Sequence, residues 1–165
     1  MELFITVAPA GYSGDTKADF ICSGKNDELT IQKAIDRCIA ENKNVMLLNG
    51  IYRIDDFHNH YNDNGPVSAI CFPNTWREIQ FYGQNSEYGF QKKYDNGVVL
   101  YVSKEALEKI SGETDVIRGQ WTEAGIQNGS SLNMKNIAVI LANNQHKLRC
   151  IDLRRTDRPN LENIT

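Results

Sequence analysis

The sequence predicts an all-β solenoid, a parallel β-helix whose N-terminal end is closed by an amphipathic capping helix. Two observations lead to this expectation. An apolar stripe with helical spacing runs from about Asn26 to Ala40. Short apolar segments follow it, and turns that contain Asn and Gly separate many of them. Such segments are typical of stacked repeats that are each too small to bury their own apolar face.

The length of 165 residues suits one domain. Residues 1–25 would hold the opening strands and a loop, residues 26–41 the capping helix, and residues 45–165 the first turns of the coil with long loops. The net charge of −3 lacks the basic excess that marks proteins binding DNA or RNA. We therefore expect no nucleic-acid partner.

The alternation of Leu3, Ile5 and Val7 predicts a first strand, and a loop follows at 9–14. A second short strand is expected at 18–22. The helical stripe consists of Ile31, Ala34, Ile35 and Cys38, at positions i, i+3, i+4 and i+7. Asn26 is the expected N-cap, and Asn42 is suited to the left-handed conformation that ends a helix.

Apolar runs bounded by turn residues predict the next elements. Strands are expected at 45–48, 51–54, 69–72, 79–81 and 97–102, with a polar loop at 55–66 and a short helix at 104–110 capped by Ser103. The last third of the chain contains short strands with Asn at their turns. Segments 136–139 and 163–165 begin with Asn-Ile and lie 27 residues apart. Asn enters the positive-φ region easily, so we expect these residues at sharp turns with their side chains stacked.

Three segments together resemble a known family. They are 18–28 (ADFICSGKNDE), 31–36 (IQKAID) and 45–54 (VMLLNGIYRI). These segments, which cover about 35 residues, resemble the N-terminal part of the pectate-lyase-like superfamily. They differ at Leu48-Asn49, where that family usually has Pro. The resemblance implies a right-handed, single-stranded parallel β-helix with the capping helix over its N-terminal end.

The resemblance also implies a carbohydrate-active protein. Many family members cleave or modify acidic polysaccharides, so the leading hypothesis is a polysaccharide lyase or glycoside hydrolase acting on an acidic polysaccharide. The alternative is a non-catalytic glycan-binding or structural solenoid, such as a surface protein or a phage tailspike stem. The expected partner is a polysaccharide or oligosaccharide, and an oligomer, a trimer if the protein is tailspike-like, fits the second hypothesis.

The candidate site is a charged segment near the end of the chain. If Ile151 and Leu153 point inward, Asp152 and Arg154 point outward on one face. The expected substrate-binding residues are Arg154, Arg155, Arg158, His146 and Trp121. Arginine binds a uronate carboxylate with two hydrogen bonds, and an aromatic face stacks on a sugar ring. Asp152 and Asp157 are the candidates for the paired carboxylates of a glycoside hydrolase. The alternative is a solvated charged face held by internal salt bridges.

No metal site or cofactor is predicted. His58 and His60 in the polar loop could bind a transition metal with an Asp of the same loop, but a loop that overhangs a binding groove explains them better. The four cysteines have no metal-ligand spacing and are expected to be buried thiols.

The sequence contains no apolar run long enough to span a bilayer and no signal peptide, so no membrane partner is predicted. A native Met1 would make the protein cytoplasmic, whereas a trimmed start would be consistent with an extracellular one. The strand-like segment at 163–165 has no cap after it, and we expect a coil that continues further.

Overall fold

The computed structural model describes residues 3–75, 77–85, 97–121, 131–143, 147–154 and 156–165. Within these residues the chain forms strands β1 (Phe4–Ala8) and β2 (Phe20–Ile21), helix α1 (Asp27–Ala40), strands β3 (Asn44–Leu47), β4 (Gly50–Ile54), β5 (Val67–Phe72), β6 (Glu78–Gly83) and β7 (Val98–Val102), helix α2 (Lys104–Glu108), and strands β8 (Thr114–Gly119), β9 (Ser131–Leu141), β10 (Leu148–Asp152) and β11 (Asn160–Ile164).

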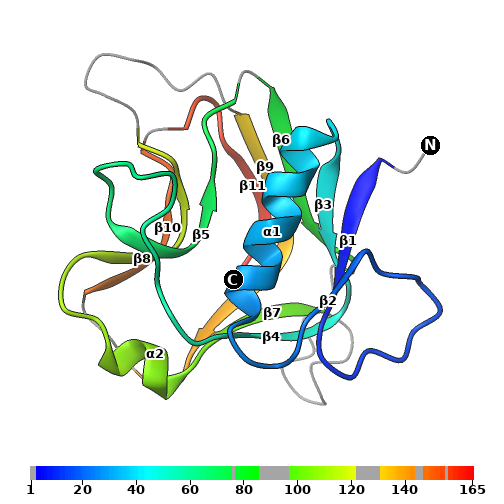
Figure 1. The fold of residues 1–165 in the computed structure, drawn as a ribbon, viewed down its shortest axis with the longest axis horizontal. Helices are drawn as coiled ribbons and strands as arrows, with labels where there is room; N and C mark the ends of the chain where they lie inside the picture. Colours follow the sequence, from blue (N-terminus) through cyan, green and yellow to red (C-terminus); the bar gives the residue numbers. More distant parts are fainter. Residues whose placement is uncertain (1–2, 76, 86–96, 122–130, 144–146, 155) are drawn as a thin grey trace.

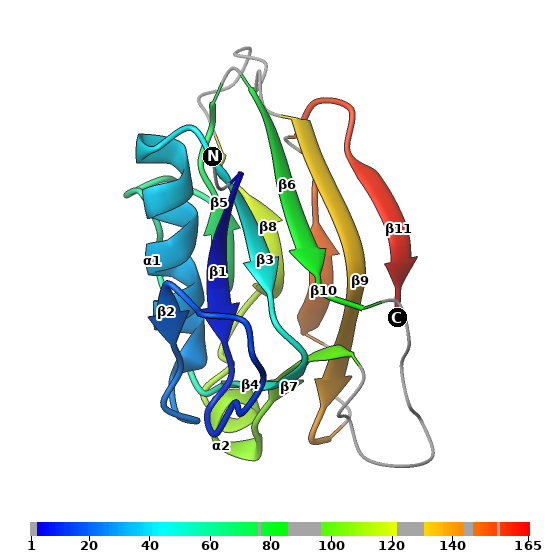
Figure 2. The same ribbon diagram turned by 90° about the vertical axis from the view of Figure 1, so that its right-hand side faces the viewer.

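The strands form two parallel sheets. The larger has eight strands in the order β2-β1-β3-β6-β9-β7-β4, with β11 also paired to β9. The smaller has the order β10-β8-β5. Figure 2 shows β1, β3, β6, β9 and β11 side by side and pointing the same way. In Figure 1 the smaller sheet lies to one side of α1.

The expected all-β, single-stranded parallel β-helix is wrong. The structure is a mostly parallel, α/β-like arrangement with helices, and its sheets do not form a solenoid. A regular coil would separate paired strands by a near-constant number of residues. Here Asn136 forms one hydrogen bond with Asn163, 27 residues away in the sequence, and another with Gly83, 53 residues away. Strand β9 pairs with β6 and β11 along its first half and with β7 along its second, which joins these strands into one sheet. The Asn motif sets the local backbone conformation, not the spacing between strands.

Helix α1 confirms the predicted amphipathic helix, with its apolar stripe fully buried. It packs against β1, β3, β4 and β5 (Figure 1). Gln32 fixes it to β5 because its side-chain amide exchanges two hydrogen bonds with the backbone of Cys71, at 2.8 and 2.9 Å. Asn26 occupies the predicted N-cap position, but it is in a left-handed conformation and its side chain makes no capping hydrogen bond.

Buried carboxylates fix the N-terminal turn of α1. Asp27 accepts the Arg53 N–H at 2.9 Å, and Glu28 accepts the Asp55 N–H at 3.1 Å. These bonds attach the helix to the end of β4 and satisfy backbone donors that would otherwise be buried without partners.

The core lies between the sheets and α1. It includes Ile5, Ile31, Ile35, Tyr52, Ile70, Phe81, Leu100, Ile117 and Met134, all fully buried. Phe72 from the smaller sheet meets Phe81 from the larger edge to face, with ring centroids 5.1 Å apart. This contact joins the two sheets through a favourable aromatic geometry.

Three asparagines adopt the predicted positive-φ conformation, but Asn136 and Asn163 lie inside β9 and β11 and not at turns between strands. Asn42, Asn136 and Asn163 have φ values of 53°, 59° and 54°. The Asn163 side-chain amide donates to Asn136 Oδ1 at 3.0 Å, which confirms the expected stacking of these two residues. The Ser103 hydroxyl accepts the Ala106 N–H and caps α2, also as predicted.

Candidate functional site

The structure brings together three of the predicted site residues: Trp121, Asp152 and Arg154. We call these three residues the arginine–tryptophan cluster. Trp121 follows β8, whereas Asp152 ends β10, which pairs with β8. Asp157 and Arg158 lie further along the chain and are exposed, with Arg158 in a positive-φ turn. The remaining two candidates, His146 and Arg155, lie outside the described residues.

A bidentate ion pair forms the centre of the cluster. Arg154 Nε and Nη2 donate to the two carboxylate oxygens of Asp152 at 2.8 and 2.7 Å, and the Arg154 N–H also donates to Oδ1 at 3.2 Å. The Asp152 side chain is only 1% exposed. The arginine covers this carboxylate, whereas Ile151 and Leu153 pack against the core, as expected for the apolar positions. The hydrogen bonds from Arg154 hold the pKa of Asp152 below its ordinary value.

Arg154 lies over the indole of Trp121, with 5.5 Å between the guanidinium carbon and the ring centroid. Its side chain is 59% exposed. A guanidinium stacked on an aromatic face and fixed by a carboxylate has little rotamer freedom left to lose on binding. The pair with Asp152 uses Nε and Nη2, and within the described part of the chain Nη1 makes no hydrogen bond, so it can donate to an outside acceptor.

A second arginine extends the ion pairs along β8 and β10. Arg149 donates to Asp115 at 2.7 Å and to Glu113 at 2.9 Å, and lies 3.6 Å from Asp152. The Asp115 side chain is fully buried, and this burial raises its pKa above the ordinary value although Arg149 opposes the change. The internal salt bridges expected under the alternative interpretation are present.

Asp63 connects the polar loop to this region. Its carboxylate accepts two hydrogen bonds from Arg118, at 2.6 and 2.8 Å, and one from the Trp121 N–H at 2.7 Å. Arg118 is fully buried. Burial acts to raise the pKa of Asp63, but the hydrogen bonds from Arg118, Trp121 and Gly65 outweigh it and lower that pKa. Asp63 thus determines where the backbone of Trp121 lies.

Sequence reasoning missed Asp63, Asp115 and Arg118 as members of this site. Residues 114–119 form the central strand of the smaller sheet, yet no strand is expected there from the pattern. The signal in the sequence is the apolar pair Val116-Ile117 between two charged residues. This pattern is hard to recognise as a buried strand, because charged side chains such as Asp115 and Arg118 are seldom buried unless they are paired.

Of the two carboxylates proposed for hydrolysis, Asp152 does not suit the role of the general acid. Asp152 is held ionised by arginine, whereas a general acid needs a raised pKa. Asp157 is exposed and lies 3.7 Å from Arg158. The arrangement suits the binding of a ligand better than proton transfer to one.

The two histidines of the polar loop make hydrogen bonds to the start of β5. The backbones of His58 and Ser68 exchange two hydrogen bonds. His60 Nε2 hydrogen-bonds to the Ser68 carbonyl at 2.9 Å. No cluster of three metal-ligating side chains occurs among the described residues. Cys22, Cys38 and Cys71 are buried, whereas Cys150 is exposed, contrary to expectation.

None of the helices described here is long and apolar enough to span a membrane. Comparisons with protein-family models, with curated proteins and with solved structures give no match. The link to the pectate-lyase-like superfamily thus remains a resemblance carried by residues 18–54.

Proposed function

We propose that the protein binds an acidic glycan through the arginine–tryptophan cluster and does not cleave it. Arg154 would donate from Nη1 to a uronate carboxylate, with the sugar ring lying beside Trp121. The observation that carries this proposal is the fixed, exposed guanidinium of Arg154, held by Asp152 at 2.7 and 2.8 Å and stacked on Trp121. Arginine is suited to this role because its planar donors match a carboxylate.

The charges around the cluster limit the kind of ligand. Arg149 and Arg154 are opposed by the carboxylates of Asp115, Asp152 and Glu113. Among the residues that the structure describes here there is no positive excess, so they exert little long-range attraction on a polyanion. We therefore expect recognition of a single sugar carboxylate by direct hydrogen bonds, with modest affinity.

The test compares a uronic-acid oligosaccharide with its methyl ester, which keeps the sugar but removes the charge. Calorimetry measures both affinities for the wild type, Arg154→Gln and Arg37→Gln. Arg37 is a matched control because it also pairs with a carboxylate (Glu41, 2.6 Å) and lies over an aromatic ring (Phe20, 5.7 Å), but on α1. Trp121 fluorescence in a Trp76→Phe background, where Trp121 is the only tryptophan, provides a local signal.

We expect Arg154→Gln to weaken binding of the acid form about tenfold or more, since a charge-assisted hydrogen bond contributes about 1.5–3 kcal/mol. Arg37→Gln should match the wild type, and the ester should bind poorly to all three proteins. Equal binding of acid and ester, or equal effects of the two substitutions, would overturn the proposal. Release of reducing or unsaturated ends by the wild type would replace it with the enzymatic hypothesis.

A further inference from the structure

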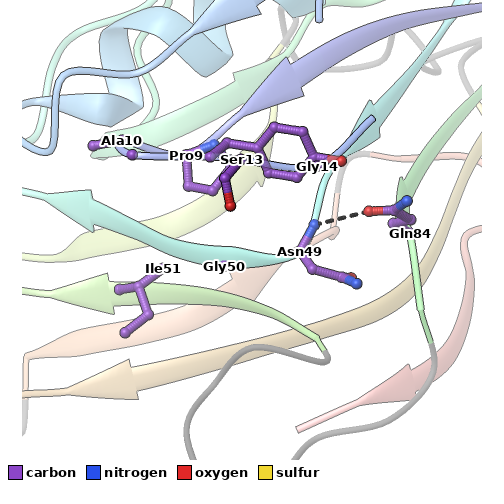
Figure 3. A pocket seen from close by; sticks show the side chains of 10 residues that line it. Pro9, Ala10, Ser13, Gly14, Asn49, Gly50, Ile51 and Gln84 are labelled. Carbon is purple, nitrogen blue, oxygen red and sulfur yellow. Dashed lines mark hydrogen bonds between the residues drawn. The ribbon is translucent and has the colours of Figure 1, made fainter. Parts of the chain in front are cut away.

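A second candidate site is a pocket of about 670 Å³ between the loop 9–14, which follows β1, and the turn from β3 to β4. Figure 3 shows Asn49 and Ile51 on the side of the turn and Gln84, just after β6, close to Asn49. The described residues that line the pocket include no carboxylate, ammonium, guanidinium or imidazole group. It therefore offers hydrogen bonds and apolar contacts in place of charge.

Asn49 contributes an acceptor that has no partner. Its Oδ1 atom is buried and accepts no hydrogen bond among the described residues. Buried polar atoms in folded proteins nearly always have a partner, and each exception calls for an explanation. A donor on a bound ligand would supply the missing hydrogen bond once the Asn49 side chain rotates to bring this buried oxygen to the pocket.

Gln84 places a donor beside that acceptor. The Asn49 backbone N–H donates to Gln84 Oε1 at 3.1 Å (Figure 3), which fixes the side-chain amide and assigns its oxygen to this bond. The Gln84 Nε2 group makes no hydrogen bond to any described residue and can act as a donor. Adjacent hydroxyls of a sugar match such a pair, because each hydroxyl both donates and accepts.

The wall of the pocket is fixed before any ligand binds. The Tyr52 hydroxyl lies 2.7 Å from the carbonyl oxygens of both Val7 and Leu48, the residue before Asn49. Gly50 has a φ of 139°, and a Cβ at this position would lie 2.5 Å from Pro9 Cγ. The Pro9 ring can approach the turn this closely only because residue 50 is glycine. Preorganisation of this kind lowers the entropy lost on binding.

We propose that this pocket binds an uncharged saccharide. A hydroxyl donates to Asn49 Oδ1, a neighbouring oxygen accepts from Gln84 Nε2, and the apolar face of the ring lies against Pro9 and Ile51. The volume accommodates a small ligand of one or two sugar units. This site is separate from the arginine–tryptophan cluster and selects an uncharged ligand in place of an acidic one. Each proposal can therefore be tested without the other.

The test is a nuclear magnetic resonance titration of the ¹⁵N-labelled protein with neutral disaccharides, in parallel with the uronic-acid disaccharide. The proteins are the wild type, Asn49→Ala, and Asn59→Ala as the control, which removes the same carboxamide from an exposed loop residue. We expect saturable shifts of the Asn49 side-chain amide and the Gly50 backbone amide with at least one neutral disaccharide. Asn49→Ala should weaken binding about tenfold, the effect of one hydrogen bond.

The Arg154→Gln variant should bind the neutral disaccharide as the wild type does, which separates this site from the proposed function. Thermal unfolding of each variant verifies that it is folded, and Asn49→Gln replaces Asn49→Ala if the latter is not. Absence of shifts at Gly50 with every neutral disaccharide would overturn the proposal. Tighter binding of the uronic-acid form at Gly50, or unchanged binding by the folded Asn49 variant, would overturn it as well.

Discussion

The arginine–tryptophan cluster and the pocket at Asn49 use opposite means to present polar groups. In the cluster a buried carboxylate, Asp152, holds an exposed arginine in place. In the pocket a backbone turn places neutral amides, and a close glycine–proline contact fixes the wall. The first depends on a charge pair at the end of β10, and the second on backbone conformation. Polar sites in one small protein can therefore be fixed by different physical forces.

The largest expected difference between the regions comes from Asp63→Asn. The change leaves the guanidinium of Arg118, which is fully buried, without its countercharge. Breaking a buried pair in this way destabilises a protein by about 3–5 kcal/mol. Chemical denaturation measures the loss, and Asp157→Asn is the control because its pair with Arg158 is exposed. A loss below about 1 kcal/mol would show that charge pairing does not hold this region together.

The next largest effect is expected from Gly50→Ala at the pocket. Alanine at a φ of 139° is strained, and its Cβ would lie 2.5 Å from Pro9 Cγ. We expect a loss of about 2 kcal/mol in the free energy of unfolding from the conformational strain, before the clash is added. Gly112→Ala should be nearly neutral, since a Cβ there meets no atom within 4 Å. Equal stabilities of the two variants would argue against a pocket fixed by its backbone.

A smaller, pH-dependent difference is expected between Asp152→Asn and the wild type. The pKa of Asp152 is lowered in the folded protein, chiefly by the hydrogen bond from Arg154. Its ionised form therefore stabilises the fold above the ordinary aspartate pKa of about 3.9, and this contribution is lost as the pH falls through the lower, folded-state pKa. Denaturation at pH 7 and at about pH 2.5 should show the two proteins converging in acid. The effect of Asn49→Ala should stay constant, because asparagine does not titrate.

The smallest effect is expected from salt. Binding of a uronate at Arg154 should weaken modestly as the Debye length shrinks to about 3 Å at 1 M salt. Binding of a neutral disaccharide at Asn49 should not change. Calorimetric titrations at low and high salt measure both, and a similar salt dependence at the two sites would remove the distinction between them.

The sequence predicted the elements that depend on nearby residues. The stripe from Ile31 to Cys38 identified α1 because the spacing of a helical face is local. Ser103 identified the start of α2, since a cap bonds to a backbone group three residues away. The sequence also grouped Trp121, Asp152 and Arg154 as site residues, although it gave no information on which of them would be buried.

The fold class and the inner contacts of the site were decided by tertiary structure. Asp63 lies 55 residues from Arg118, and Asp115 lies 34 residues from Arg149, so no short window of sequence relates them. Strand pairing is a property of segments that meet only after the chain has folded, whereas helix periodicity and turn preference act within a few residues. The helices and the local backbone conformations could therefore be predicted from this sequence, whereas the arrangement of its sheets could not.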